Sequence, residues 1–386
     1  MTVERTIMPT RGKSAHDVVI VGGGVIGCSI AYFLAAHHGI QAVILERDGI
    51  GSGASGNAAG ELAAVGRHQY SDMYTKFILQ GIAMHHELAD EIMDTSGIDY
   101  LFSDITQVRP ALNRSDVTDL QYQVHWQESL GLSANWVEPS ELKSRYGWLS
   151  HKALGAVETV EKQLESYPFC LAILRAAEKL GVTVKFGDAA KIVQLPGQIV
   201  EVELESGETI QTANLVIANG PWAVALGASL GFTIPMKPLR GQIVHAALPS
   251  GFRLPSYSIF HDANYMLPKA SGALLLGTTD EAVGFNPFPT KEAERDIVAS
   301  VIDMIPPLEA ASVIRTTACL RPSTPDDLPI IGQIPDLDGI YLATGHGHKG
   351  ITLALITGKA IGDLVAQRNC DIDISMFNLS RFGTMQ

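Results

Sequence analysis

Cysteine is scarce in this sequence: the 386 residues include four, and no two of them form a CxxC pair. Such scattered thiols argue against a disulfide framework and a structural zinc site, and they are typical of a reducing compartment. No other residues have a metal-binding spacing, so we expect no metal site. The four cysteines are Cys28, Cys170, Cys319 and Cys370.

Long apolar runs are also absent. The sequence contains no stretch of about 18 apolar residues, the length that a transmembrane helix needs. Its first 16 residues contain no apolar core of the kind found in signal peptides. We therefore expect a cytoplasmic protein with a flexible tail over residues 1–14, and we leave open peripheral contact with the inner face of a membrane.

Clusters of basic residues are missing as well. The 28 basic and 41 acidic residues give a net charge of −13, which disfavours a nucleic-acid partner. Hydrophobic residues make up 46% and charged residues 18%, as in a folded globular chain. Because 386 residues are too many for one compact core, we expect two domains.

The first strong pattern that is present is a β-α-β unit. Asp17–Val21 is almost wholly apolar, as expected of a buried parallel strand. Val25–His38 has apolar residues at helical spacing and ends before Gly39, a common stop signal. Ala42–Leu45 is a second apolar strand, followed by Glu46. This order predicts a Rossmann-type nucleotide-binding domain.

The turn of this unit carries a nucleotide fingerprint. Residues 22–27 read GGGVIG and satisfy G-x-G-x-x-G between the expected strand and helix. We expect Gly22 to allow the tight turn, Gly24 to let the backbone approach a pyrophosphate, and Gly27 to let the helix pack on the strand. Glu46 is expected to accept hydrogen bonds from ribose hydroxyls.

A segment of small residues favours FAD over NAD as the ligand. Residues 49–60 are rich in Gly, Ser and Ala, where an NAD enzyme would continue a regular βαβ alternation. Small side chains let the backbone lie against a flat ring system, and Ser52 and Ser55 can donate to phosphate oxygens. An ordinary flexible loop is the alternative interpretation.

The pattern changes at Met236 to short β-rich runs, which predict an antiparallel sheet. The last strand and helix, Ile340–Thr344 and Ile351–Ala366, resemble the first unit again. We expect an α/β chain, in which a Rossmann-type FAD-binding domain is interrupted by an α+β substrate domain built on the antiparallel sheet. The expected limits are 15–85, 151–228 and 320–380 for the FAD-binding domain, and 86–150 and 229–319 for the substrate domain.

Three segments together resemble the D-amino-acid oxidase superfamily. They are VIVGGGVIG with LERDGIGSGASGNAAG, then HDANYMLP, then CLRP with PIIG and ATGHGHKGI. The likeness runs from about Asp17 to Val365 and is greatest to the glycine oxidase branch, which includes hydrogen cyanide synthase subunits and D-amino-acid dehydrogenases. It implies a two-domain flavoprotein whose flavin ring lies at the domain interface, facing the antiparallel sheet.

The resemblance also implies where FAD is held. The backbone of residues 345–352, at the start of a helix, would stabilise the reduced flavin at its N1–C2 carbonyl region. The backbone of Ala190 would meet the adenine. The expected FAD-binding residues are Gly22, Gly24, Val25, Ile26, Gly27, Glu46, Arg47, Ser52, Ser55, Asn57, Ala58, Ala59, Gly60, Ala190, Asn219, Gly220, Trp222, Gly345, His346, Gly347, His348, Lys349, Gly350, Ile351 and Thr352.

Three residues are candidates for the catalytic site. Arg321 is expected to bind a substrate carboxylate, because a guanidinium offers two parallel hydrogen bonds and stays charged when desolvated. The matching position of the family has that role. Tyr265 would supply a second hydrogen bond, with a plain sheet tyrosine as the alternative. His348 stands where the branch often has an arginine near the substrate.

Two positions depart from the related sarcosine oxidases. Asp280 stands where those enzymes have an oxygen-activating lysine, which favours a dehydrogenase over an oxidase. Cys319 matches their site of covalent flavin attachment, and a free buried cysteine is the alternative.

These features predict an FAD-dependent enzyme that oxidises a small amino acid or secondary amine to its imine by hydride transfer to flavin N5. Glycine, sarcosine, small D-amino acids and D-proline all fit a carboxylate clamp. The electron acceptor would be O2, a quinone or a protein partner. The chain would work as a homo-oligomer or within a hetero-oligomeric dehydrogenase. The alternative function is that of an FAD-carrying subunit of an opine dehydrogenase or a hydrogen cyanide synthase-like complex.

Overall fold

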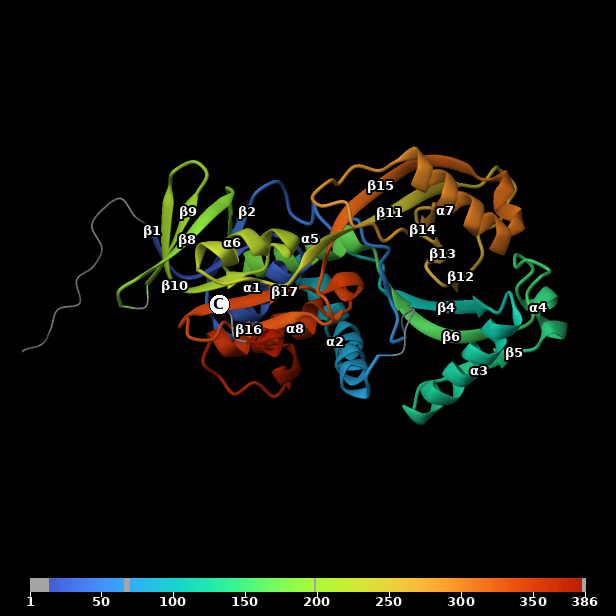
Figure 1. The fold of residues 1–386 in the computed structure, drawn as a ribbon, viewed down its shortest axis with the longest axis horizontal. Helices are drawn as coiled ribbons and strands as arrows, with labels where there is room; N and C mark the ends of the chain where they lie inside the picture. The colour runs from blue at the N-terminus through green and yellow to red at the C-terminus, as the bar shows by residue number, and fades with distance from the viewer. Residues whose placement is uncertain (1–13, 66–69, 198, 384–386) are drawn as a thin grey trace, which may run out of the picture.

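Two sheets organise the chain, and they lie at opposite ends of the longest axis of the molecule (Figure 1). The computed structural model describes residues 14–65, 70–197 and 199–383. Of the predicted N-terminal tail, residues 1–13 lie outside the described residues. Ser14 already belongs to the first strand.

The first sheet is built around parallel strands. Its strands are β1 (Ser14–Val21), β2 (Ala42–Glu46), β7 (Thr183–Phe186), β8 (Ala189–Leu195), β9 (Ile199–Leu204), β10 (Thr209–Ile217), β16 (Ile330–Gln333) and β17 (Ile340–Thr344). The order is β16-β17-β10-β1-β2-β7, and β9 with β8 extends it from β10. β1 pairs in parallel with both β2 and β10. Its apolar sequence suits a strand that is buried on both faces.

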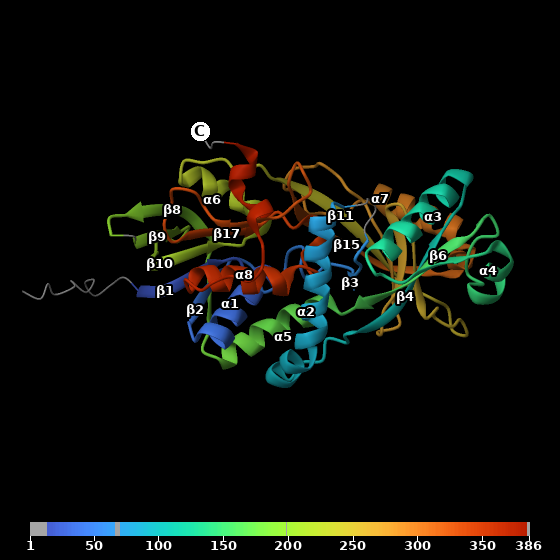
Figure 2. The same cartoon turned by 90° about the horizontal axis from the view of Figure 1, so that it is seen from below.

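Helices cover this sheet. They are α1 (Val25–His38), α2 (Asp72–Ser96), α5 (Ser166–Lys179), α6 (Ala223–Ser229) and α8 (Ala354–Val365). α5 and α8 pack on α1, and α2 packs on α5 and α8 (Figure 2). α6 packs near β8 in the core of the opposite face. Within the described ranges, none of the helices is long and apolar enough to cross a membrane.

The second sheet is mostly antiparallel. Its strands are β3 (Glu61–Leu62), β4 (Ser103–Pro110), β5 (Ala134–Val137), β6 (Ala156–Gln163), β11 (Lys237–Ala247), β12 (Tyr257–His261), β13 (Asn264–Pro268), β14 (Leu274–Gly277) and β15 (Ser312–Ser323). The order is β15-β11-β14-β13-β12-β4-β6-β3, with β5 paired to β6. The neighbours β12 and β4 are parallel, a departure from the expected antiparallel pattern. α7 (Lys291–Met304) packs on one face, and α3 (Arg114–Ser129) and α4 (Pro139–Arg145) lie beside β5 and β6 (Figure 1).

The chain passes between the sheets four times. It leaves the first sheet after β2, returns to it after β6, leaves again for β11 and comes back after β15. This confirms the expected interruption of a Rossmann-type unit. The exact domain limits stay a prediction. β6 lies in the second sheet although 151–228 was assigned to the FAD-binding domain, and α2 runs without a break through the limit at 85.

Two elements match the sequence-based expectation residue for residue, namely α1 and β17. The last helix begins at Ala354 instead of Ile351, because residues 347–349 form a short 3-10 turn before it. β4 and β6 were not expected, and both contribute to the site.

Candidate active site

A cavity of about 740 Å³ lies between the two sheets. One wall consists of the turn after β1, the loop after β2 and the segments that follow β10 and β17. The other wall is one face of the second sheet, with residues from β4, β11, β12, β13 and β15. Because the carboxyl ends of parallel strands collect loops at one edge of a sheet, this is where an α/β fold binds ligands.

The turn between β1 and α1 has the geometry of a dinucleotide site. Gly22 has φ +111°, and a β-carbon there would lie 2.7 Å from the carbonyl oxygen of Ala218. A β-carbon at Gly27 would lie 2.0 Å from the carbonyl oxygen of Gly22, so only glycine lets α1 approach the strand. Gly24 borders the cavity, as expected for the pyrophosphate approach. Gly27 itself does not line the cavity, in keeping with its packing role.

Glu46 holds this turn in place. Its carboxylate accepts hydrogen bonds from the backbone N–H groups of Gly23 at 2.7 Å, Asp48 at 2.8 Å and Gly49 at 3.1 Å. The same side chain lines the cavity. Glu46 therefore fixes the loop after β2 against the glycine turn, in addition to its predicted contact with a ribose.

The loop over residues 49–60 lies across the start of α1. The Ser55 hydroxyl accepts a hydrogen bond from the backbone N–H of Val25 at 3.0 Å. Asn57 donates through Nδ2 to the carbonyl oxygen of Gly53 at 2.9 Å, which braces the loop from within. Gly60 has φ +87° and packs against the carbonyl of Leu164. The expected residues that line the cavity here are Ser52, Ser55, Asn57, Ala58, Ala59 and Gly60.

The far end of the cavity suits an adenine ring. The Arg47 guanidinium lies 4.7 Å from the ring centre of Trp222. Asp188 and Ala189 complete this end. Ala190 is exposed and does not line the cavity, whereas its neighbour Ala189 does, and the pairing of β8 with β9 shifts register between Ala189 and Lys191.

Asn219 shows whether the cavity has a polar group that a bound dinucleotide could satisfy. It follows β10, lines the cavity beside Gly220, and its buried Oδ1 has no hydrogen-bond partner among the described residues. A buried acceptor without a partner costs about 1–3 kcal/mol unless a ligand or water satisfies it. Together with the glycine turn, this acceptor fits a cavity that is completed by a bound dinucleotide.

Arg321 enters the same cavity from β15. Its NH1 donates to Asp280 Oδ1 at 2.5 Å and to the Thr279 carbonyl oxygen at 3.0 Å, and its NH2 donates to Thr278 Oγ1 at 2.8 Å. His348 Nε2 lies 3.4 Å from Asp280 Oδ1. The structure therefore brings together two of the three expected catalytic residues, with an acid between them.

Tyr265 is the third expected catalytic residue and lies on β13. Its ring stacks on Phe260 with centroids 5.0 Å apart and covers Gly277, where a β-carbon would lie 2.3 Å from the ring. With Ile243 these side chains form an apolar patch on the cavity side of the sheet. A flat ring could lie on such a patch.

Comparison with known proteins identifies the family of this chain. The sequence profile described as FAD dependent oxidoreductase, of the DAO family, matches residues 17–364.

The chain belongs to this family of FAD-dependent oxidoreductases.

Two relatives match this chain over nearly its whole length. A glycine oxidase of Geobacillus kaustophilus is 28% identical over 370 residues, covering 95% of this chain and 97% of the relative. The hydrogen cyanide synthase subunit HcnC of Pseudomonas aeruginosa is also 28% identical, covering 95% and 96%. The crystal structure of the glycine oxidase from Geobacillus kaustophilus superposes with a TM-score of 0.90, covering 96% of this chain and 99% of that one. FAD is accordingly the cofactor of the family to which this chain belongs.

The turn after β17 lines the cavity with its backbone. Gly345 and Gly347 have φ +76° and +49°, and residues 346–352 line the cavity. His346 is buried, lies 3.1 Å from Thr357 Oγ1 through Nε2, and burial lowers its pKa to about 3. A neutral His346 is therefore a structural part of the turn. The backbone N–H groups of the turn remain the expected contacts of the flavin.

A second polar cluster on the cavity wall was not anticipated from the sequence. We call it the Glu61 cluster: Glu61, Gln107, Arg109, Glu161, Ser258 and Lys349. Glu61 Oε1 accepts from Ser258 Oγ at 2.8 Å and from Gln107 Nε2 at 3.2 Å. Its other oxygen, Oε2, is buried without a hydrogen-bond partner in the part of the chain that the structure describes.

Burial changes the acid–base properties of the Glu61 cluster. Burial raises the pKa of Glu61 to about 7 and lowers the pKa of Lys349 to about 8, although Glu161 and Glu61 oppose the second shift. Lys349 also donates to the Ala63 carbonyl oxygen at 2.6 Å. The runs 103–110 and 156–163 do not alternate regularly between apolar and polar residues, so hydrophobic periodicity gives no signal for β4 and β6. The pairing of these strands is what places Gln107, Arg109 and Glu161 on one face.

Cys319 lines the cavity, and burial raises the pKa of its thiol. A raised pKa lowers the thiolate fraction that a covalent bond to flavin requires. In residues 14–65, 70–197 and 199–383 no three His, Cys, Asp or Glu side chains are grouped so that they could hold a metal ion.

Proposed function

We propose that this chain oxidises a small amino acid, or a secondary amine that carries a carboxylate, to the corresponding imine with FAD as its cofactor. The observation that carries the proposal is Arg321. Its guanidinium lies in the same cavity as the apolar patch, where a small substrate would lie over the flavin ring. When bound, FAD supplies the acceptor for the hydride.

FAD would be held mainly by backbone and small side chains. The glycine turn and Ser55 would face the pyrophosphate, Arg47 and Trp222 would flank the adenine, and Asn219 would donate or accept at the ring or ribose. The turn over residues 346–352 would lie at the pyrimidine end of the flavin. Gly22 and Gly24 of the turn line the cavity, as do Ser55, Arg47, Trp222, Asn219 and residues 346–352.

Arg321 would orient the substrate. A guanidinium binds a carboxylate through charge-assisted hydrogen bonds, and this places the neighbouring carbon and nitrogen in a fixed position. The Arg321 side chain is 11% exposed, so water screens its charge little. Tyr265 and Ile243 would form the apolar floor and exclude water from the reacting atoms.

A substrate screen with purified holoenzyme tests the proposal. Glycine, sarcosine, D-alanine, D-proline and the opine-type amines would be offered with an artificial electron acceptor under argon, and with air alone. We expect dye reduction with at least one of them. Turnover in air without dye would identify an oxidase, and turnover with dye only would identify a dehydrogenase. A holoenzyme that oxidises none of the panel under either condition would contradict the proposal.

The name of one relative favours a second candidate. The relative from Pseudomonas aeruginosa is a subunit of a synthase and resembles this chain over 95% of its length. In that case the chain would carry FAD for a larger complex and would pass its electrons to a partner protein. Co-expression with its neighbouring genes and purification through a tag on this chain would test it: a stoichiometric partner that raises turnover supports this candidate, and full activity of the isolated chain contradicts it.

A further inference from the structure

Asp280 lies next to Arg321 in the cavity, and we propose that it binds the ammonium group of the substrate. The acid would then select zwitterions and discriminate against simple carboxylates. This inference rests on the proposed function, because it requires Arg321 to bind the carboxylate of the same molecule.

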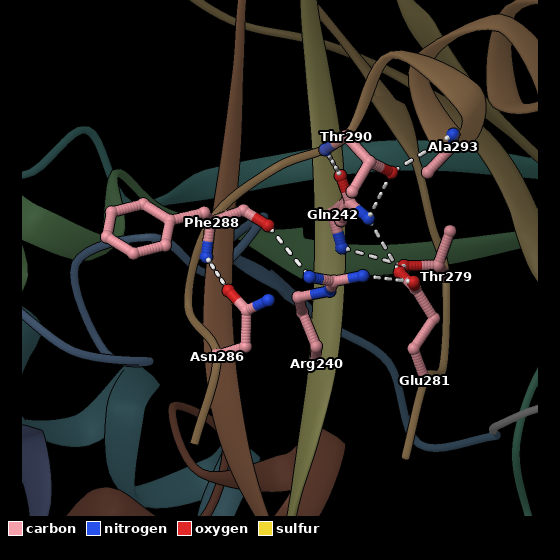
Figure 3. A network of polar contacts seen from close by, with 8 residues as sticks. All are labelled: Arg240, Gln242, Thr279, Glu281, Asn286, Phe288, Thr290 and Ala293. Carbon is pink, nitrogen blue, oxygen red and sulfur yellow. Dashed lines mark hydrogen bonds and ion pairs between the residues drawn. The ribbon is translucent and has the colours of Figure 1, made fainter. Parts of the chain in front are cut away.

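The backbone around Asp280 fixes the direction of its side chain. Thr279 and Glu281 both point into a polar network on the outer side of the sheet, where the Thr279 hydroxyl donates to Glu281 Oε1 at 2.6 Å (Figure 3). Side chains alternate between the two sides of an extended chain. Asp280, which lies between these two residues, therefore points the other way, and it lines the cavity.

The network leaves this segment little freedom to move. Arg240 donates to Glu281 Oε2 at 2.5 Å, and Gln242 donates to Glu281 Oε1 at 2.7 Å (Figure 3). The backbone groups of Arg240 and Glu281 also exchange two hydrogen bonds of 2.9 Å each. Gln242 accepts in turn from the backbone N–H of Thr290 at 2.8 Å. Because its neighbours are anchored on both sides, Asp280 is held in the cavity with or without a ligand.

Arg321 is held just as firmly beside the acid. Three consecutive residues accept its hydrogen bonds, namely Thr278, Thr279 and Asp280. The guanidinium lies flat on Gly241, where a β-carbon would be 2.1 Å from its Cζ. A glycine at this position makes the space for the guanidinium. Acid and base thus form a preorganised pair of opposite charges at one end of the cavity.

The charges of this pair complement those of an amino acid: Arg321 is positive where the substrate carboxylate would lie, and Asp280 is negative where its ammonium would lie. A ligand with only a carboxylate must compete with Asp280 for Arg321 and meets repulsion from that acid. A zwitterion places its carboxylate on Arg321 and its ammonium on Asp280, so that both charges are compensated. The Asp280 side chain is 27% exposed, and therefore a ligand in the cavity can reach it.

The Glu61 cluster lies on other strands of the second sheet than the Arg321–Asp280 pair. Gln107 and Arg109 lie on β4, which is four strands away from β11, where the Arg321 guanidinium lies. Four strand spacings amount to about 19 Å, several times the length of a small amino acid. Because Asp280 is hydrogen-bonded to Arg321 itself, a substrate carboxylate on Arg321 brings the neighbouring ammonium close to Asp280.

Two ligands of equal shape test the inference. 2-Aminoisobutyrate and pivalate differ in one group, ammonium against methyl, and neither has an α-hydrogen, so neither is oxidised. Their dissociation constants for the holoenzyme are measured from the change in the flavin absorbance spectrum. We expect the wild type to prefer the zwitterion, and Asp280→Asn to bind 2-aminoisobutyrate about 10-fold more weakly and pivalate about 10-fold more tightly, as one charge-assisted contact is lost and one competitor removed.

The two dissociation constants are expected to change in opposite directions, which distinguishes a role in ligand recognition from general damage to the site. A merely structural role for Asp280 would weaken both ligands in Asp280→Asn, and that result overturns the inference, as does an unchanged ratio. Asp280→Glu keeps the charge and should retain the preference for the zwitterion. Asp262→Asn is the matched control: this acid also lines the cavity, its side chain is 85% exposed, and the ratio should stay that of the wild type. If the wild type binds neither ligand and oxidises no amine, the proposed function itself fails; normal turnover with an unchanged ratio refutes only the role of Asp280.

Discussion

The two walls of the cavity are built by different means. The wall of the first sheet is made largely of backbone and small residues, with Gly22 and Gly24 in one turn and Ser55 hydrogen-bonded across it. The wall of the second sheet is made of long side chains from strands that are distant in sequence, such as Arg321 and Tyr265. The first wall suits a cofactor that never changes, and the second can vary with the substrate.

The largest effect is expected where the first wall has no room for a side chain. In Gly24→Leu the new side chain would start 3.2 Å from Ser55 Oγ and fill the approach of the pyrophosphate. The purified variant should contain no FAD, as measured by the ratio of flavin to protein absorbance. Gly147→Ala is the control, since its β-carbon has ordinary contact with Lys143 at 3.5 Å, and it should keep its flavin. A yellow Gly24→Leu protein would show that the turn does not bind the cofactor.

Substitutions in the second wall should lower the rate of turnover and leave the FAD content unchanged. Arg321→Lys replaces a planar fork with a point charge, so both the binding and the orientation of a carboxylate suffer. We expect kcat/KM on the best amino acid to fall by about 10- to 150-fold at unchanged FAD content. Arg315→Lys, an exposed position on the same strand, should have no effect. A loss of activity that parallels a loss of FAD would instead make Arg321 a cofactor residue.

The sequence predicts the first wall better than the second, because the contacts of the first wall are closer together along the chain. The dinucleotide turn is local, because its strand, turn and helix all lie within residues 14–38, and the roles of Gly22, Gly24 and Gly27 are predicted from the sequence pattern alone. The Arg321–Asp280 pair joins residues 41 apart, and its geometry depends on the register of β11 against β15.

Two further results could not be inferred from local pattern. The Glu61 cluster depends on pairing between β3, β4, β6 and β12, which sequence periodicity alone does not align. Ala190 does not line the cavity although its neighbour Ala189 does, and the pairing of β8 with β9 is irregular at this point. Residues 1–13 of the expected tail fall outside the described residues.

A smaller effect is expected at the Glu61 cluster, where the free energy of unfolding should depend on pH. Burial raises the pKa of Glu61 from 4.5 to about 7, so the folded protein holds this proton more tightly than the unfolded chain. Stability from this group is therefore present at low pH and is lost as the pH rises from about 4.5 to 7. The loss amounts to at most about 3 kcal/mol.

Glu61→Gln should remove that component of the pH dependence. The free energy of unfolding of wild type and variant, measured in urea between pH 5 and pH 7, should converge at low pH and diverge in favour of the variant at pH 7. Lys349, with a pKa of about 8, acts above this window. Parallel pH curves for the two proteins would mean that Glu61 is ionised throughout and that its proton is not held by the fold.

The smallest effect is expected at Cys319. Its buried thiol has a raised pKa, and we expect no bond to the flavin. Precipitation of the holoenzyme with acid should release all flavin into the supernatant, and Cys319→Ala should purify with the same FAD content. Colour that stays with the wild-type pellet but not with the variant would establish a thioether at this residue.

The central claim is that the flavin accepts electrons from an amine whose carboxylate is bound by the second wall. Rapid mixing of holoenzyme with substrate in the absence of oxygen tests it most directly. The best amino acid from the screen is compared with the same amine without its carboxylate, for example sarcosine with dimethylamine. The account predicts fast loss of the oxidised flavin absorbance with the carboxylated amine and a reduction slower by at least about 10-fold with its partner. Equal rates for the two would contradict it.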